Sequence, residues 1–307
     1  MGVFDHILDT FPLTREEAEL LLWTAPARYK VHEIEKRNGR GMRTIAQPTA
    51  EIKLLQRLMV EKYVSKLPVS DVATAYRKGV GIADHAKLHA KNRYLLKLDF
   101  TNFFPSIRAI DFLKHLAKYG PIEKEDAKYL TRLFFWRPKG ERALVLSIGA
   151  PSSPSISNTI MFDFDRAVET YCSDKAVVYS RYADDLAFST NNPGVLNEVH
   201  NYIIALCQKV KYPSLRINVG KTVYTSKKHR RQLTGLILSN DGQPSLGREK
   251  KHLIRAMANR FRKGELSPED VAKLRGWIAF SMSFDERFVD AIRRMIGEDM
   301  LQRLMKI

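Results

Sequence analysis

The sequence is poor in cysteine and in long apolar runs. It holds 2 cysteines, Cys172 and Cys207, which are too few and too far apart for a disulfide framework or a cysteine-rich zinc site. We expect both to be buried free thiols. No apolar run approaches the roughly 20 residues of a membrane span, and residues 1–12 lack the layout of a secretory signal. These absences predict a cytoplasmic protein with no membrane contact.

Acidic residues are also scarce relative to basic ones. The 307 residues include 34 Asp and Glu against 51 Lys and Arg, which gives a net charge of +17. Such an excess of cations attracts phosphate backbones, so we expect nucleic acid as the partner. The sequence has no internal repeat and no low-complexity tract, and 44% of it is hydrophobic. One multi-lobed unit or two to three small subdomains with a real core would suit this composition.

Residues 177–189 form the stretch around which the rest is organised. Two arms rich in Val, Tyr, Leu and Phe flank Asp184 and Asp185, which predicts two strands with the acidic pair at the tip of a tight hairpin. Adjacent carboxylates repel each other, and hairpin turns ordinarily favour Asn-Gly or Asp-Gly. A divalent cation that also holds substrate phosphates would explain the pair. A solvated acidic turn is the alternative that the pair alone leaves open.

A second acidic position follows an apolar run at residues 93–100. Here a predicted strand ends on Asp99. An acid at the end of one strand and a pair at a hairpin could converge as three carboxylates around two cations about 4 Å apart, an arrangement that drives phosphoryl transfer.

Three further features have a functional and an ordinary interpretation. Residues 29–48 predict a basic hairpin that would suit phosphates or simply face water. The loop at residues 147–154 is rich in Gly, Pro and Ser, so it could bring backbone close to a ligand or be a plain loop. Lys221 could donate a proton or be a surface lysine.

Two basic segments could contact nucleic acid. His85 and His89 are four residues apart and would share a helix face; zinc would suit this spacing, but no third ligand is evident, so we favour an RNA contact or a capping role. Residues 247–307 predict helices with a basic face, which could bind a duplex or be solvated. The basic residues that stand close together at its start are Arg248, Lys250, Lys251, Arg255, Arg260, Arg262 and Lys263.

Taken in order, these segments resemble the reverse transcriptases, and specifically the retron reverse transcriptases of bacteria. The family pattern Tyr-x-Asp-Asp stands at residues 182–185, the preceding acid motif at 98–107 and the glycine motif at 149–158. Residues 233–236 resemble the retron Val-Thr-Gly signature, and residues 85–89 resemble its Asn-Ala-x-x-His element. The departures from the family are His85 for Asn, Leu233 for Val, and Ile148 where many relatives carry Gln.

The resemblance implies an α+β fold in the form of a right-hand polymerase. It places the N-terminal helices and fingers at residues 1–92 and a palm, made of an antiparallel sheet plus helices, at 93–240. Part of the fingers would be inserted at approximately 108–150, and a helical thumb would follow at 241–307.

The resemblance also implies two-metal nucleotidyl transfer. Asp99 and Asp184 would hold two Mg²⁺ ions with help from Asp185 and the carbonyl of Phe100, and Lys221 could protonate the leaving pyrophosphate. The implied dNTP contacts are Arg37, Arg43, Gly149, Ala150 and Phe104, the last of which would block a ribose 2′-hydroxyl. The implied nucleic-acid contacts are His85, His89, Thr234, Gly235, Arg248, Lys250, Lys251, Arg255 and Arg262.

The implied biology is copying of a structured non-coding RNA into RNA-linked DNA, primed from a guanosine 2′-hydroxyl. We expect this to serve antiphage defence, with an effector protein from the same operon as partner and a cellular RNase H removing the template RNA. Two alternatives stay open. The chain could be an intron-derived or diversity-generating reverse transcriptase, or an RNA- or effector-binding scaffold whose catalysis is secondary.

Overall fold

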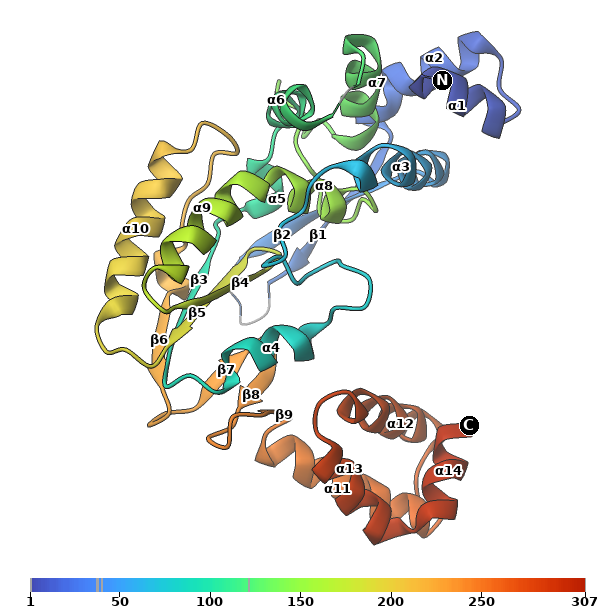
Figure 1. The fold of residues 1–307 in the computed structure, drawn as a ribbon. Coiled ribbons are helices and arrows are strands. Elements are labelled where there is room, and N and C mark those ends of the chain that lie inside the picture. The colour runs from blue at the N-terminus through green and yellow to red at the C-terminus, as the bar shows by residue number, and fades with distance from the viewer. Residues whose placement is uncertain (1, 37–38, 40, 121, 307) are drawn as a thin grey trace.

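The computed structural model describes residues 2–36, 39, 41–120 and 122–306. Helices and short antiparallel sheets share the chain, which confirms the predicted α+β class (Figure 1). The strands are β1 (Tyr29–Glu35), β2 (Met42–Pro48), β3 (Tyr94–Asp99), β4 (Val178–Tyr182), β5 (Asp185–Thr190), β6 (Val223–Ser226), β7 (Arg231–Leu233), β8 (Leu236–Leu238) and β9 (Pro244–Ser245).

The helices surround these strands and fill both ends of the chain. The α-helices are α1 (Val3–Thr10), α2 (Arg15–Thr24), α3 (Ala50–Lys62), α4 (Ile82–Ala90), α5 (Phe103–Ser106), α6 (Ala109–Tyr119), α7 (Lys124–Phe134), α8 (Ser153–Ile160), α9 (Phe162–Ser173), α10 (Val195–Lys209), α11 (Arg248–Arg262), α12 (Pro268–Met282), α13 (Glu286–Ile296) and α14 (Glu298–Lys306). Short 3-10 turns are η1 (Ala25–Ala27), η2 (Val64–Lys66) and η3 (Val219–Lys221).

Local sequence signals explain several of these boundaries. The Thr14 hydroxyl accepts a hydrogen bond from the Glu17 amide at 3.3 Å, and the Glu17 carboxylate accepts one from the Thr14 amide at 2.8 Å. This capping box satisfies two free donors at the start of α2. The predicted basic hairpin is the β1–β2 ribbon, in which Tyr29 pairs with Pro48 at one end and Glu35 with Met42 at the other. Arg37 lies outside the described residues.

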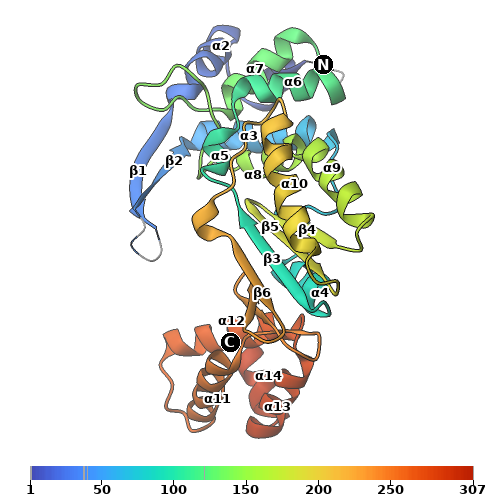
Figure 2. The same cartoon turned by 90° about the vertical axis from the view of Figure 1, so that its left-hand side faces the viewer.

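The central sheet has the antiparallel order β4-β5-β3-β6. Successive side chains of a strand point to opposite faces, and β3 is apolar on both. Leu96 and Leu98 join the larger hydrophobic core, whereas Leu95 joins a second one. Helices α9 and α10 cover one face of the sheet and α4 lies against the other (Figures 1 and 2).

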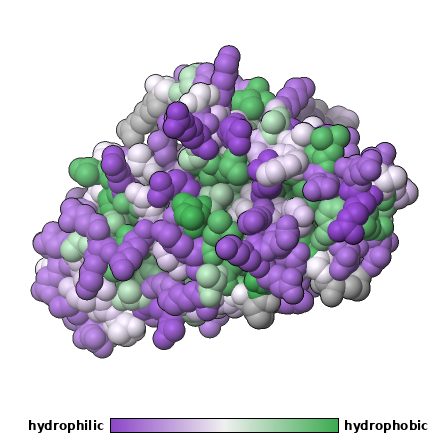
Figure 3. Space-filling view, turned by 90° about the horizontal axis from the view of Figure 1, so that it is seen from above, coloured by the Kyte–Doolittle hydropathy of each residue, from purple (hydrophilic) through white to green (hydrophobic). Residues whose placement is uncertain are grey.

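The two cores correspond to two regions of the molecule. The larger core joins the central sheet to α1–α3 and α6–α10, and the second joins α4 and the β7-β8-β9 sheet to α11–α14. Figure 2 shows these last four helices as a separate bundle below the sheets. From above, hydrophilic side chains predominate and apolar ones form small separate patches (Figure 3). No helix in the described part of the chain has both the length and the apolar character needed to cross a membrane.

The cysteines are free thiols, as predicted. Cys172 is buried and Cys207 is half-buried. Burial raises the pKa of each thiol to about 12, so neither is a reactive thiolate at neutral pH.

Candidate active site

The three predicted acidic residues meet where β3 and β5 lie side by side. Asp99 ends β3, Asp185 begins β5, and the two are direct partners in the antiparallel register. The Phe100 amide donates a hydrogen bond to the Asp184 carbonyl at 3.1 Å, which ties the end of one strand to the hairpin tip. Residues far apart in the sequence are therefore neighbours, as the strand and hairpin patterns predict.

The hairpin tip has a special backbone. Ala183 has a φ of +57°, a left-handed conformation that is uncommon for residues other than glycine. The buried guanidinium of Arg181 donates a hydrogen bond from Nη1 to the Ala183 carbonyl at 3.0 Å. This contact holds the turn residue directly before Asp184 in place.

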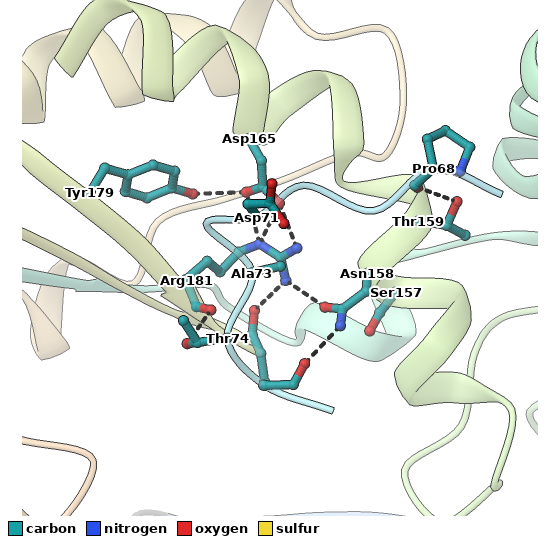
Figure 4. A network of polar contacts seen from close by, with 12 residues as sticks. Pro68, Asp71, Ala73, Thr74, Ser157, Asn158, Thr159, Asp165, Tyr179 and Arg181 are labelled. Atoms are coloured by element: carbon teal, nitrogen blue, oxygen red, sulfur yellow. Dashed lines mark hydrogen bonds and ion pairs between the residues drawn. The ribbon is translucent and has the colours of Figure 1, made fainter. Parts of the chain in front are cut away.

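Arg181 belongs to a buried cluster that joins the hairpin to two helices (Figure 4). Its guanidinium makes a bidentate pair with Asp165 of α9, with Nη2 to Oδ2 at 2.6 Å and Nε to Oδ1 at 2.9 Å. It also reaches the Asn158 side chain of α8 at 3.2 Å, and the Tyr179 hydroxyl donates to Asp165 at 2.8 Å. We call Arg181, Asp165, Asn158 and Tyr179 the Arg181 cluster. Paired and hydrogen-bonded in this way, a buried charge is tolerated.

The same cluster anchors the loop before α4. Thr74 donates two hydrogen bonds to the Arg181 carbonyl, from its amide at 2.8 Å and from its hydroxyl at 3.0 Å. Asn158 donates its side-chain amide to the Ala75 carbonyl at 2.8 Å. The next residue, Tyr76, is half exposed and has a φ of +61°. Such strain in a bulky residue occurs mainly at functional sites.

The acidic residues repel one another. Burial, and then the charge of Asp99, raises the pKa of Asp184. Burial, and then the charges of Asp184 and Asp99, raises the pKa of Asp185 to about 6. Lys221 of η3 relieves part of this repulsion, because its Nζ lies 2.8 Å from Oδ2 of Asp99. The lysine predicted near the site is therefore in contact with a predicted metal ligand.

The carboxylates of Asp99, Asp184 and Asp185 suit a divalent cation, although they do not form a closed metal site. Within the described residues, no group of three or more His, Cys, Asp or Glu side chains is arranged to hold a metal ion. Oδ1 of Asp99, however, is buried without a hydrogen-bond partner among those residues. A buried orphan carboxylate oxygen beside mutually repelling carboxylates suits a hard cation such as Mg²⁺. Asp99 and Asp184 would be its first ligands.

Three of the predicted nucleotide contacts line a cavity of about 400 Å³, and the charge of Asp184 acts on Tyr76 at its lining. These three contacts are Phe104, Gly149 and Ala150. Gly149 has a φ of +121°, and a Cβ on it would lie 3.1 Å from the Gln47 side chain and 3.2 Å from the Ala46 carbonyl. Only glycine allows this close approach of β2 to the loop. Arg43 of β2 is exposed, and its charge lowers the pKa of Asp184 in opposition to the burial that raises it.

Four lining residues of this cavity lie outside the Gly, Pro and Ser loop and were not predicted as site residues. They are Gln47, Lys53, Arg57 and Tyr76. Lys53 and Arg57 stand four residues apart outside the apolar stripe of α3, and residues at this spacing share a helix face. That spacing could have indicated a shared ligand. No pattern in the sequence predicts the backbone conformation of Tyr76 or the position of Gln47 at this cavity.

The histidines of α4 correct a prediction. His85 and His89 are fully buried, so in this structure neither can contact nucleic acid directly. His89 is hydrogen-bonded to Ser180 at 2.7 Å and Ser189 at 2.8 Å, and His85 to Ser180 at 2.9 Å. The ring of His85 also lies 5.6 Å from that of Tyr182. The two histidines therefore support the β4–β5 hairpin that carries Asp184 and Asp185.

The other predicted nucleic-acid contacts lie on the accessible surface. Thr234 and Gly235 form the β7–β8 turn with φ of +46° and +88°, as hairpin turns require. On α11 the side chains of Arg248, Lys250, Arg255 and Arg262 are exposed, whereas Lys251 is half-buried. Lys251 forms an ion pair with Asp285 at 2.6 Å.

The comparisons with known proteins agree with this geometry. Residues 34–238 match the family model described as reverse transcriptase (RNA-dependent DNA polymerase). The Retron Ec83 reverse transcriptase of Escherichia coli is 42% identical over 94% of this chain and 93% of its own length. The Retron Ec73 reverse transcriptase of the same species is 31% identical over 88% of this chain and 87% of its own length.

A solved structure supports the fold. Apo telomerase from Candida tropicalis superposes with a TM-score of 0.50 at 13% identity, covering 91% of this chain and 63% of that one. At this identity the likeness bears on the fold alone. By the family match and the close relatives, the chain belongs to the reverse transcriptases, and among them to the retron reverse transcriptases.

Proposed function

We propose that this protein copies a structured non-coding RNA into RNA-linked DNA by two-metal nucleotidyl transfer. The observation that carries the proposal is the pairing of Asp99 with Asp185 across β3 and β5, with Lys221 2.8 Å from Asp99. Divalent cations bound there would activate the primer hydroxyl and neutralise the triphosphate. The names of the retron relatives support RNA-templated synthesis of this kind.

Each side chain would then have a limited task. Asp99 and Asp184 hold the cations, with Asp185 and the Phe100 carbonyl assisting. Lys221 keeps a proton near the position of the leaving pyrophosphate. In the cavity beside them, Phe104 excludes a ribose 2′-hydroxyl, and the loop backbone at Gly149 and Ala150 approaches the nucleotide.

Several further points belong to the same proposal. The fingers, palm and thumb divide near residues 92 and 240, with part of the fingers inserted at about 108–150. Arg37 and Arg43 contact the triphosphate, and the β7–β8 turn and the basic face of α11 contact nucleic acid. Priming uses a guanosine 2′-hydroxyl, and the protein acts in the bacterial cytoplasm in antiphage defence, with an effector protein and a cellular RNase H.

The proposal is tested by substitution of one carboxylate. Asp184→Asn removes a ligand charge worth several kcal/mol of transition-state stabilisation, so dNTP incorporation on a primed RNA template should fall about 10³-fold or more. Asp174→Asn, an exposed change at the end of α9, is the matched control and should leave incorporation unchanged. An Asp184→Asn protein that extends primers at the control rate would refute the mechanism.

Two further measurements separate the alternatives. The nucleic acid that copurifies with the protein from its native operon should contain an RNA–DNA hybrid sensitive to debranching; a hybrid joined through a 3′-hydroxyl would favour another class of bacterial reverse transcriptase. Phage protection should be lost with Asp184→Asn. Protection that survives this change would favour a scaffold for RNA or effector.

A further inference from the structure

A short segment before α4 extends the central sheet beyond β4. It runs parallel to β4, because the Arg181 amide donates to the Val72 carbonyl at 2.8 Å and the Thr74 amide donates to the Arg181 carbonyl at 2.8 Å. Parallel neighbours advance in the same direction. Tyr76, which follows this pairing, therefore lies toward the end of the sheet at which Asp184 follows Arg181.

Asn158 fixes the next part of this segment. It is 2% exposed, and each half of its side-chain amide has a partner. Nδ2 donates to the Ala75 carbonyl at 2.8 Å, and Oδ1 accepts from Nη1 of Arg181 at 3.2 Å. Figure 4 shows this amide between the guanidinium of Arg181 and the segment before α4. A side chain of α8 therefore sets where the backbone directly before Tyr76 lies relative to the β4–β5 hairpin.

These contacts hold Tyr76 in an unusual conformation. Its φ of +61° is left-handed, which is uncommon for a bulky residue, and such strain persists only where the surrounding structure imposes it. The ring does not fill the core, because Tyr76 is 49% exposed. It lines the cavity of about 400 Å³ that Phe104 and Gly149 also line. The anchored segment therefore presents an exposed aromatic ring to this cavity.

The chemistry of the lining suits a nucleotide base at this ring. Burial, and then the charge of Asp184, raises the pKa of the Tyr76 hydroxyl, so the phenol stays neutral near pH 7. An aromatic ring stacks on any base, because every base has a π-face. The cations of the lining are Lys53 and Arg57, and these suit phosphate. The rings of Tyr76 and Phe104 are left for the base and the sugar.

We propose that Tyr76 is a specificity-determining residue of DNA synthesis, whose ring packs against the base of the incoming deoxynucleotide, and that Asn158 is the positioning residue that holds this ring. The inference rests on the proposed polymerase function and adds two residues to it. Asn158 acts through the Ala75 carbonyl rather than through the substrate. A correctly paired base lies flat against the ring, whereas a mispaired base is displaced from it, so the contact favours correct pairing.

The experiment measures steady-state incorporation of a matched and a mismatched dNTP by the full-length protein on a primed RNA template. Tyr76→Leu keeps an apolar side chain but removes the ring. The KM for the matched dNTP should rise about five- to tenfold with a smaller change in kcat, and discrimination against the mismatch should fall. Tyr76→Phe keeps the ring and should behave as the wild type. Tyr224→Leu is the matched control, because Tyr224 is 47% exposed and lies outside the cavity; it should leave both parameters unchanged.

Three results would overturn the assignment of Tyr76. The first is equal kinetics of Tyr76→Leu and the Tyr224→Leu control. The second is an unchanged KM for dNTP with a weaker affinity for the primer–template, which would place the ring on the template. The third is a Tyr76→Phe protein as impaired as Tyr76→Leu, which would assign the role to the hydroxyl. A wild type that incorporates no dNTP would refute the proposed polymerase function and the inference with it, whereas these three results in an active protein refute the inference alone.

The positioning role is tested by Asn158→Asp, which keeps an oxygen for Arg181 but has no donor for the Ala75 carbonyl. The KM for the matched dNTP should rise toward that of Tyr76→Leu, and adding Asn158→Asp to Tyr76→Leu should raise it no further. An unchanged KM in the single variant, or additive increases in the double variant, would show that Asn158 does not act through Tyr76. Circular dichroism establishes that the variant is folded. If it is not, Thr74→Val takes its place, because it removes the hydroxyl bond of the same segment to the Arg181 carbonyl at 3.0 Å.

Discussion

Arg181 and Arg231 are both buried, and their surroundings differ. Arg181 makes a bidentate pair with Asp165 at 2.6 and 2.9 Å, next to the hairpin of Asp184 and Asp185. Arg231 is held by backbone carbonyls, including those of Leu238 and Ser239, and burial lowers its pKa. Both side chains are buried. Within the described part of the chain, a carboxylate pairs with Arg181 and none pairs with Arg231.

This difference separates a buried charge that is balanced by a carboxylate from one that is balanced by carbonyl dipoles. The Arg181 cluster is complete, so it can fix the backbone at Ala183 without help. Arg231 donates to backbone carbonyls, but among the described residues it has no ion pair and its Nε has no hydrogen-bond partner. Helix α4 connects the two regions, because His89 bonds Ser180 near one arginine while the Ala90 carbonyl accepts from the other.

The largest effect should come from breaking the Arg181 pair. Asp165→Asn leaves a buried guanidinium without its counter-ion, and we expect the free energy of unfolding to fall by about 3–5 kcal/mol. Arg181→Met should lower the free energy of unfolding by a similar amount, because it leaves the Asp165 carboxylate buried without a cation. Urea unfolding followed by circular dichroism measures both. The double variant Arg181→Met with Asp165→Leu should regain part of the loss; strictly additive losses would contradict a direct pairing.

The sequence predicted this hairpin well and its support poorly. The alternation of apolar residues and the turn at Asp184 and Asp185 are local signals, and they placed β4, β5 and the end of β3 at Asp99 correctly. The ion pair of Arg181 with Asp165 joins a strand to a helix, and nothing in the spacing of the two residues reveals it. Long-range partners of buried charges depend on packing, which the local pattern does not encode.

The histidines show why one prediction, their direct contact with nucleic acid, was wrong. His85 and His89 stand on one helix face among basic residues, and charge suggested a surface. Their hydroxyl partners, Ser180 and Ser189, come from strands about 90 to 100 residues later. Once those hydroxyls satisfy the rings, burial is possible. The strained Tyr76 was missed for a related reason, since its φ follows from loop anchoring rather than from residue type.

The second largest effect should come from acid, which should lower the free energy of unfolding through the buried histidines of α4. Burial lowers the pKa of His85 to about 4 from 6.5, so the unfolded state binds more protons between these values. Stability is then fully present above pH 6.5 and is lost as pH falls toward 4. The shift corresponds to about 3 kcal/mol at the acid end, and His89, whose pKa burial also lowers, adds to it.

The pH dependence is checked by unfolding at several pH values between 4 and 7. His85→Asn, which restores the residue of the retron element at this position, should flatten the profile by about 3 kcal/mol over this window. An unchanged slope would mean that His85 does not titrate as a buried group. His229→Asn, an exposed change, is the control and should not alter the slope.

Substitution of Arg231 should lower the free energy of unfolding less than substitution of Arg181. Arg231→Met leaves carbonyls such as those of Ser239 and Leu238 without donors, at about 1–3 kcal/mol, but it also removes a charge that lacks a counter-ion. A loss as large as that of Arg181→Met would erase the distinction between the two arginines.

The smallest effect should come from an ion pair that lies near Arg181 but faces water. Asp71 pairs with Arg77 at 2.9 Å, yet the Asp71 side chain is 93% exposed. Water and salt screen such a pair, so Asp71→Ala should change the free energy of unfolding by less than about 0.5 kcal/mol. The change should be smaller still at 0.5 M salt, where charges are screened over a distance on the order of 4 Å. Arg77 keeps its bonds to the carbonyl of Ala73. A loss comparable with that of Asp165→Asn would show that pairing in this loop, rather than burial, determines how strongly a carboxylate supports the hairpin.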